Sequence, residues 1–427
     1  MAKIQIGDYI EVVTSSGNIK GNLMPSTTNK VIVKLDNGYN IGISRDKIKR
    51  VVLIKKAQTR REKLETVKEK KGLPVISILH TGGTVASKVD YNTGAVTASY
   101  DPEELVAMFP ELGEIANIRS RLISNMFSED MRFSHYNLIA KEIKKEIMRG
   151  VNGIIITHGT DTITYTAAAL AFIIEDLPIP VILVGAQRSS DRGSSDVALN
   201  LLCSFHFITK TNFAEVAICM HESIDDEACL IMPACKTRKL HSSRRDAFKV
   251  FNGKPYARVT KDGNIEILSW FRKVNNETPK LSFIKENMKI GILKIHPNMI
   301  PEEFLQYKTY DGLILEGTGL GHLPINTPDR YTKIHKKNYL ILKKLAKKMP
   351  VVITTQTIFG RVNLNVYATG RKLQEIGILG NYTDMLTETA FIKLVWLLSN
   401  YKKETRNLID KNLRGEISER ITEEFLE

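Results

Sequence analysis

The sequence predicts an α/β protein in which two domains with doubly wound parallel sheets follow a small all-β barrel. Short runs of alternating polar and apolar residues fill residues 1–54, whereas strand and helix patterns alternate from Val75 onward. Alternation of this second kind is typical of parallel sheets with right-handed crossovers. The length of 427 residues also exceeds what one core normally supports.

Residues 1–54 are expected to form five short strands that resemble an SH3-like or Sm-like barrel. The strands are expected at Asp8 to Val13, Asn18 to Met24, Lys30 to Leu35, Tyr39 to Ser44 and Ile48 to Ile54. Asp36-Asn37-Gly38 fits a hairpin turn, because Asn-Gly tolerates the positive φ angles of a type I′ turn. Such barrels bind RNA or peptides in some families and only pad an interface in others.

Residues 55–72 are charged, have almost no apolar face and fit a solvated linker helix, which Gly72 and Pro74 end. The larger α/β domain is then expected over residues 73–268. Its predicted strands are Val75 to Leu79, Arg119 to Ile123, Ile154 to Thr157, Pro180 to Val184, Glu215 to Cys219, Ala228 to Ile231 and Ala257 to Leu268. Its predicted helices are Pro102 to Met108, Ser134 to Arg149, Thr164 to Glu175 and Ser194 to Ile208.

Residues 269–287 are polar and irregular, which indicates a connector to a smaller α/β domain over residues 288–427. The smaller domain is expected to contain strands at Lys289 to Ile295, Gly312 to Glu316 and Val351 to Thr354. Its helices are expected at Pro301 to Tyr307, Lys333 to Lys348 and Glu388 to Asn400, before a charged helical tail.

Composition excludes several kinds of function. The four cysteines form no Cys-x-x-Cys pair and are expected to be buried thiols, and the nine histidines form no HExxH motif, so we expect no catalytic metal. No P-loop or dinucleotide motif is present. An apolar run of about 18 residues and a signal-peptide core are both absent, which predicts a cytoplasmic protein. The net charge of +14 fits either a polyanionic partner or a lysine-rich surface.

The stretch from Ile154 to Thr164 is the strongest candidate for chemistry. An apolar strand there ends in glycine and is followed by Thr160 and Asp161. Ligands of open α/β sheets bind just beyond such strand ends. The alternative is that one of these two residues merely caps the next helix. A similar strand end, His80 to Thr84 (HTGGT), favours a pocket shared by both strands.

A threonine hydroxyl needs a neighbouring base to act as a nucleophile, and a lysine held by a carboxylate can serve. Lys236 and Lys239 are the candidates, and spacing alone does not choose between them or exclude that both are solvated surface lysines. The glycines of the TGGT turn suit a substrate carbonyl that lies against backbone amides, as in an oxyanion hole.

Five motifs in order resemble those of the L-asparaginase family over about Leu73 to Asn400. They are HTGGTVAS (80–87), SEDM (128–131), THGTDT (157–162), GAQR (185–188) and RKLHSSRRDAF (238–248). The resemblance implies that Thr84 is the nucleophile and that Thr160, Asp161 and Lys239 support it. Lys239 is preferred because the family's lysine stands nine residues before a phenylalanine, here Phe248.

The same resemblance implies a substrate pocket. Ser128 and Glu129 match the residues that hold the α-carboxylate and α-amine of the substrate, with Gly83 and Gly159 beside them. The family often places a tyrosine on a mobile lid after the nucleophile. That position is not aromatic here, and Tyr91 nearby is the lid candidate.

The N-terminal barrel and linker distinguish a branch of the family, the asparaginase-like subunits of archaeal glutamyl-tRNA(Gln) amidotransferases. This resemblance implies a homodimer that hydrolyses glutamine or asparagine inside a heterotetramer. It also implies a partner subunit that carries ATP, Mg²⁺, the kinase and transamidase activities and Glu-tRNA(Gln), with no cofactor in this chain. A free-standing cytoplasmic L-asparaginase and a non-catalytic RNA-binding protein are the two alternatives.

Overall fold

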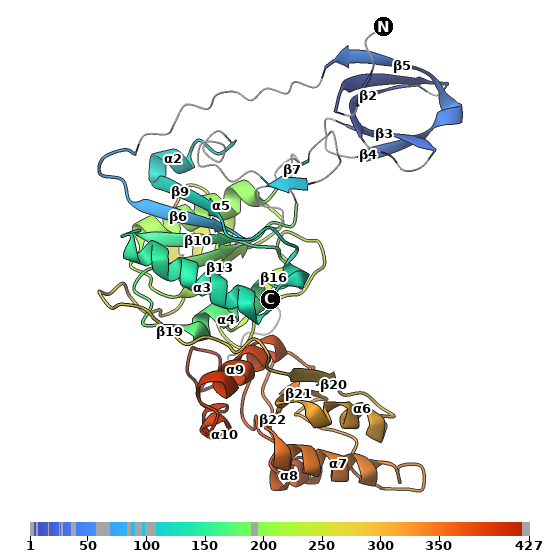
Figure 1. Ribbon diagram of the computed structural model, residues 1–427, viewed down its shortest axis with the longest axis vertical. Coiled ribbons are helices and arrows are strands. Elements are labelled where there is room, and N and C mark those ends of the chain that lie inside the picture. Colours follow the sequence, from blue (N-terminus) through green and yellow to red (C-terminus); the bar gives the residue numbers. More distant parts are fainter. Residues whose placement is uncertain are drawn as a thin grey trace.

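The computed structural model describes residues 4–5, 7–15, 17–24, 26, 29–35, 40–56, 69–82, 87–89, 96–98, 108–188 and 195–420. Along the chain it contains an N-terminal sheet, a large α/β unit and a smaller α/β unit, coloured from blue to red in Figure 1. Within these ranges, no helix is both long enough and apolar enough to cross a membrane. The four cysteines are buried free thiols, as expected.

The N-terminal sheet has five antiparallel strands in the order β4-β3-β2-β1-β5. They are β1 (Tyr9–Thr14), β2 (Gly17–Met24), β3 (Lys30–Lys34), β4 (Asn40–Ser44) and β5 (Ile48–Lys55). Ile10, Val12 and Val33 form part of its small core. The strand pairings of the described residues do not include one between β4 and β5, which would close the predicted barrel. Most of the predicted linker helix, residues 57–68, lies outside the described residues.

The large unit is built on an eight-stranded sheet in the order β18-β17-β14-β13-β12-β10-β6-β9. Its strands are β6 (Val75–His80), β9 (Asn117–Leu122), β10 (Gly153–Thr157), β12 (Val181–Val184), β13 (Val216–His221), β14 (Ala228–Pro233), β17 (Ala257–Thr260) and β18 (Ile265–Ile267). Its helices are α2 (Leu112–Ile115), α3 (Phe133–Met148), α4 (Ile163–Ile173) and α5 (Val197–Lys210).

The sheet has a core on each face, which confirms the doubly wound prediction. Ile154 and Ile156 belong to the cluster formed with α3 and α4, whereas Ile155 belongs to the cluster formed with α5. Successive side chains of a strand point to opposite faces, so an uninterrupted apolar strand fills both cores. The five strands from β9 to β13 are parallel.

The antiparallel edge of this sheet departs from the sequence prediction. Strands β14, β17 and β18 are antiparallel to their neighbours, because hairpins and not crossover helices connect them. Residues Ala257 to Leu268, expected as one strand, therefore form the pair β17 and β18. Gly263, with a φ of 78°, makes the turn between them.

Two further boundaries differ from the prediction. The helix expected at Thr164 to Glu175 ends at Ile173, where two β-branched residues in succession favour an extended chain. The next residues form β11 (Ile174–Glu175), which pairs with β19 (Lys280–Leu281) of the expected connector. Of the helix expected at Pro102 to Met108, only Met108 lies within the described residues.

The smaller unit has a parallel sheet of β20 (Ile290–Lys294), β21 (Gly312–Gly317) and β22 (Val351–Thr355). Its helices are α6 (Pro301–Leu305), a 3-10 turn (Gln306–Thr309), α7 (His335–Lys348), α8 (Ala368–Glu375), α9 (Thr387–Asn400) and α10 (Thr405–Leu408). Helix α9 packs on α4 and joins the two units (Figure 1). Helix α8 was not predicted from the sequence.

The helical tail expected after Tyr401 is wrong beyond α10. Residues 409–420 are irregular and fold back onto the protein. Glu416 holds them there, because its buried carboxylate pairs with Lys393 at 2.6 Å and accepts hydrogen bonds from the N–H groups of Leu413 and Arg414.

Candidate functional site

Three strand ends meet at one edge of the large sheet. Strand β10 lies between β6 and β12, and Thr157 pairs with His80 on one side and Val184 on the other. Residues 81–82, 158–161 and 185–187 therefore leave the sheet side by side. The expectation that both threonine-containing strand ends share one edge is consistent with this register.

Lys239 contacts the turn that follows β10. It ends β15 (Thr237–Lys239), which forms a hairpin with β16 (Phe248–Val250). Its Nζ donates hydrogen bonds to Thr160 Oγ1 at 2.9 Å and to Asp161 Oδ1 at 2.7 Å. Thr160 is buried, whereas the Asp161 side chain is 68% exposed. The structure thus brings a hydroxyl, a carboxylate and an ammonium group together.

The alternative that Thr160 or Asp161 only caps the next helix finds no support. Thr162 occupies the position before α4, and the helix has no side-chain cap there. The Thr162 hydroxyl instead donates a hydrogen bond of 2.6 Å to the carbonyl of Ser128.

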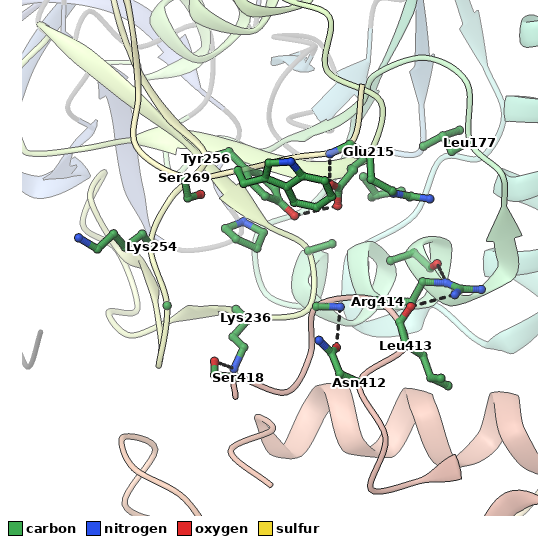
Figure 2. A pocket seen from close by; sticks show the side chains of 18 of the residues that line it. Leu177, Glu215, Lys236, Lys254, Tyr256, Ser269, Asn412, Leu413, Arg414 and Ser418 are labelled. Carbon is green, nitrogen blue, oxygen red and sulfur yellow. Dashed lines mark hydrogen bonds between the residues drawn. The ribbon is translucent and has the colours of Figure 1, made fainter. Parts of the chain in front are cut away.

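Lys236 lies in a different environment from Lys239. Only 5% exposed, it donates hydrogen bonds to Asp384 Oδ2 at 2.7 Å and Ser418 Oγ at 2.8 Å. It lines a cavity of about 470 Å³ together with Glu215 near the start of β13, at the opposite end of the sheet from Thr160 (Figure 2). The alternative that both lysines are solvated surface residues is therefore wrong, and only Lys239 contacts Thr160 and Asp161.

Two buried histidines fix the strand ends beneath the site. His80 hydrogen-bonds with Thr157 Oγ1 at 2.8 Å and with Ser120 Oγ at 2.9 Å. His158 hydrogen-bonds with Thr166 Oγ1 at 2.8 Å. Burial lowers the pKa of each histidine to about 4, so both rings are neutral at pH 7. They support the backbone of the site.

The turn with Ser128 and Glu129 packs against the Thr160 turn. Ser128 is buried and Glu129 is exposed at the start of a 3-10 turn (Ser128–Asp130). A Cβ atom on Gly159 would lie 2.8 Å from Ser128 Cβ, so only glycine permits this approach. Ser128, Glu129 and Thr162 also line a cavity of about 440 Å³.

Gln187 is a further residue of the site and was not among the predicted ones. Thr160 Oγ1 donates to Gln187 Oε1 at 3.5 Å, and Gln187 Nε2 is buried without a partner among the described residues. Asp196 holds the loop by accepting the N–H groups of Gln187 and Arg188 at 3.0 and 2.9 Å. A signal for it exists in the sequence, because GAQR follows the strand next to β10.

Thr84, Gly83 and Tyr91 lie outside the described residues. The preceding Gly82 has a φ of 112°, and a Cβ there would lie 2.3 Å from the Met126 carbonyl oxygen. The chain therefore leaves β6 through a bend that requires glycine. Beyond it, β7 (Ser87–Val89) and β8 (Val96–Ala98) pair on either side of Tyr91 in the chain. The described part of the chain contains no group of three or more His, Cys, Asp or Glu side chains suited to a metal ion.

Family comparisons match three successive parts of the chain. The family described as GatD N-terminal domain matches residues 4–54. Asparaginase, N-terminal, matches residues 75–271, and the Glutaminase/Asparaginase C-terminal domain matches residues 289–408.

Curated relatives match along almost the whole chain, and each is named as a D-type component of glutamyl-tRNA(Gln) amidotransferase. The protein of this name from Pyrococcus furiosus is 43% identical, over 97% of this chain and 95% of that protein. The one from Methanococcus maripaludis is 41% identical, over 98% and 99%.

Solved structures of L-asparaginases match the two α/β units. The thermostable L-asparaginase of Thermococcus kodakarensis has a TM-score of 0.69 and 29% identity, covering 81% of this chain and 100% of that one. L-asparaginase I of Vibrio cholerae has a TM-score of 0.66 and 28% identity, with coverage of 81% and 99%.

Proposed function

We propose, from the premise that the chain belongs to the GatD family of glutamyl-tRNA(Gln) amidotransferase components, that it hydrolyses the side-chain amide of glutamine and supplies the ammonia for amidation of Glu-tRNA(Gln). The observation that carries the chemistry is Lys239 Nζ, within hydrogen-bond distance of both Thr160 Oγ1 and Asp161 Oδ1. A lysine held this way between a hydroxyl and a carboxylate is suited to move protons at a reacting centre.

In the proposed reaction, the Thr84 hydroxyl oxygen attacks the carbon of the glutamine side-chain amide. A hydroxyl is a weak nucleophile near neutral pH and needs a base to take its proton. Lys239 and Thr160 relay that proton, and Asp161 stabilises the charged lysine. The C–N bond then breaks, ammonia leaves with the proton, and water hydrolyses the glutamyl ester on Thr84.

The proposed substrate pocket uses the turns that converge on Thr160. Ser128 and Glu129 bind the α-carboxylate and α-amine, and Gly83 and Gly159 admit the amide close to the backbone. Gln187 is a further candidate, because its unpartnered Nε2 donor lies next to the Thr160 hydroxyl. Closure of the segment around Tyr91 excludes water from the acyl intermediate.

Amidation requires a second kind of chain, in this proposal the partner component of the amidotransferase that has the kinase and transamidase activities. Converting a carboxylate into an amide requires its activation, and ATP with Mg²⁺ supplies this by phosphorylation. The partner carries those cofactors and Glu-tRNA(Gln), while this chain has none of its own. Two copies of the chain form a homodimer, which light scattering of the purified protein tests directly.

Ammonia release from glutamine and from asparagine, by wild type and by Thr84→Ala, tests the hydrolytic reaction. The proposal expects release by wild type and none by the variant. Equal release by Thr84→Ala contradicts it. A free-standing L-asparaginase is the second candidate, favoured by the 81% coverage of the asparaginase structures, but it leaves the N-terminal sheet over residues 4–54 without a role.

A further inference from the structure

A strongly basic hollow lies in the smaller α/β unit, where β21 and β22 begin. Its volume is about 410 Å³. Six cationic side chains line it, Lys285, Lys347, Lys348, Lys402, Lys403 and Arg406, against the single carboxylate of Asp311. Lys236 and Lys239 are not among its lining residues, so the hollow is separate from both the candidate active site and the cavity of Figure 2.

The positive charge of this basic hollow is not neutralised from within. Asp311 already accepts a hydrogen bond of 2.9 Å from the N–H group of Lys289. Lys285, Lys347, Lys402 and Lys403 are exposed, and their side chains have no partner among the described residues. Four ammonium groups therefore face a hollow that offers them one carboxylate.

Helix ends explain only part of this cluster. Lysines near a helix C-terminus are favoured by the helix dipole, and Lys347 lies in the last turn of α7. Arg406 already caps α7, however, by donating to the carbonyls of Ala346 and Met349. Lys285 belongs to no helix and still lines the hollow. The convergence of the cations exceeds what helix capping requires.

We propose that the basic hollow binds the sugar–phosphate backbone of an RNA. Lysine is depleted in protein–protein interfaces, whereas phosphate contacts in nucleic-acid complexes come mainly from lysine and arginine. The net charge of +14 has the matching sign. Contacts of this kind position an RNA without reading its sequence. Only the expectation that the bound RNA is a tRNA rests on the proposed function.

Binding of labelled RNA to the full-length chain tests this site. We would compare Lys402→Gln/Lys403→Gln with Lys336→Gln/Lys337→Gln, two exposed lysines in the first turn of α7 that do not line the hollow. The probes are a tRNA transcript and a random-sequence RNA of equal length. Each is titrated between about 50 and 200 mM salt, where phosphate contacts dominate the salt dependence.

Loss of each lysine–phosphate contact should reduce the slope of log Kobs against log salt by about 1, so the Lys402/Lys403 pair should reduce it by about 2. Both RNAs should weaken equally, and the Lys336/Lys337 pair should leave the slope unchanged. Equal effects of the two pairs, or no RNA binding by wild type, overturn the proposal.

A third comparison separates RNA from an acidic protein as the occupant. If the Lys402/Lys403 pair loses binding to polyglutamate while RNA binding is unchanged, the hollow binds acidic protein and the proposal fails. Ammonia release from glutamine should be unchanged in this pair. Wild type that binds RNA but releases no ammonia would contradict the proposed function and leave the RNA site standing.

Discussion

The Nζ atom of Lys239 lies 2.9 Å from the hydroxyl oxygen of Thr160, although 79 residues separate them in the chain. The hairpin of β15 and β16 carries the lysine across that separation. Because Asp161 accepts a second hydrogen bond from the same ammonium group, removal of any of the three side chains leaves the others without their partner.

Thr160→Ala, Asp161→Ala and Lys239→Ala should each reduce kcat for glutamine hydrolysis by roughly 10³-fold or more, and a double variant should lose little beyond the worse single one. Residues that act as a unit give such non-additive losses. Lys249→Ala is the control, because Lys249 on β16 donates instead to the carbonyl of Glu222. Steady-state kinetics of Lys239→Ala close to wild type would contradict the proposed role.

Lys236 is expected to affect stability, which changes its use as a control for Lys239. Lys236→Met leaves the buried Asp384 carboxylate without its charge partner, and breaking such a pair costs about 3–5 kcal/mol. Lys236→Met/Asp384→Leu should be less destabilised than Lys236→Met alone. Urea unfolding measures both, with the exposed Lys344→Met expected within about 0.5 kcal/mol of wild type. Unchanged stability of Lys236→Met would argue against the ion pair.

Gly159→Ala should raise KM for glutamine, because the added Cβ would meet Ser128 at 2.8 Å and displace the turn that is proposed to bind the substrate's α-carboxylate and α-amine. Gly253→Ala is the matched control, since its Cβ would have 3.8 Å to the nearest atom. Kinetics of both variants, alongside their melting temperatures, separate a binding defect from unfolding. Identical KM values would show that Ser128 does not contact substrate.

His80 should make the protein sensitive to acid. Burial lowers its folded-state pKa from the ordinary value of 6.5 to about 4, so the unfolded chain binds the proton more tightly. The stabilisation is complete above pH 6.5 and is lost as the pH falls to 4, by about 3 kcal/mol for one such group. The free energy of unfolding of His80→Gln should fall less steeply over that window. Parallel curves for variant and wild type would contradict this.

The sequence predicted the elements whose pattern is local. The uninterrupted apolar run of β10 and its register beside β6 follow from strand patterns, and this register places the turn that holds Thr160 beside the end of β6. The choice between Lys236 and Lys239 could not be made from spacing. It depends on Asp384, 148 residues from Lys236, which withdraws that lysine into a buried ion pair.

The parts that were missed depend on tertiary contacts in the same way. The tail after α10 is irregular because the carboxylate of Glu416 pairs with Lys393, and a charged sequence gives no local sign of that contact. The antiparallel edge strands β17 and β18 are separated by one glycine turn within an otherwise strand-like run. Gln187, in contrast, could have been found from the position of its motif after the strand next to β10.

Coupling of hydrolysis to amidation tests the central claim most directly. Ammonia from glutamine and Gln-tRNA(Gln) formed are measured together for the chain with its partner, ATP, Mg²⁺ and Glu-tRNA(Gln). The account predicts that hydrolysis rises when the partner and Glu-tRNA(Gln) are both present, and that Thr84→Ala in the same complex forms product only from added ammonia. Hydrolysis indifferent to partner and Glu-tRNA(Gln), or amidation from glutamine by the Thr84→Ala complex, would contradict it.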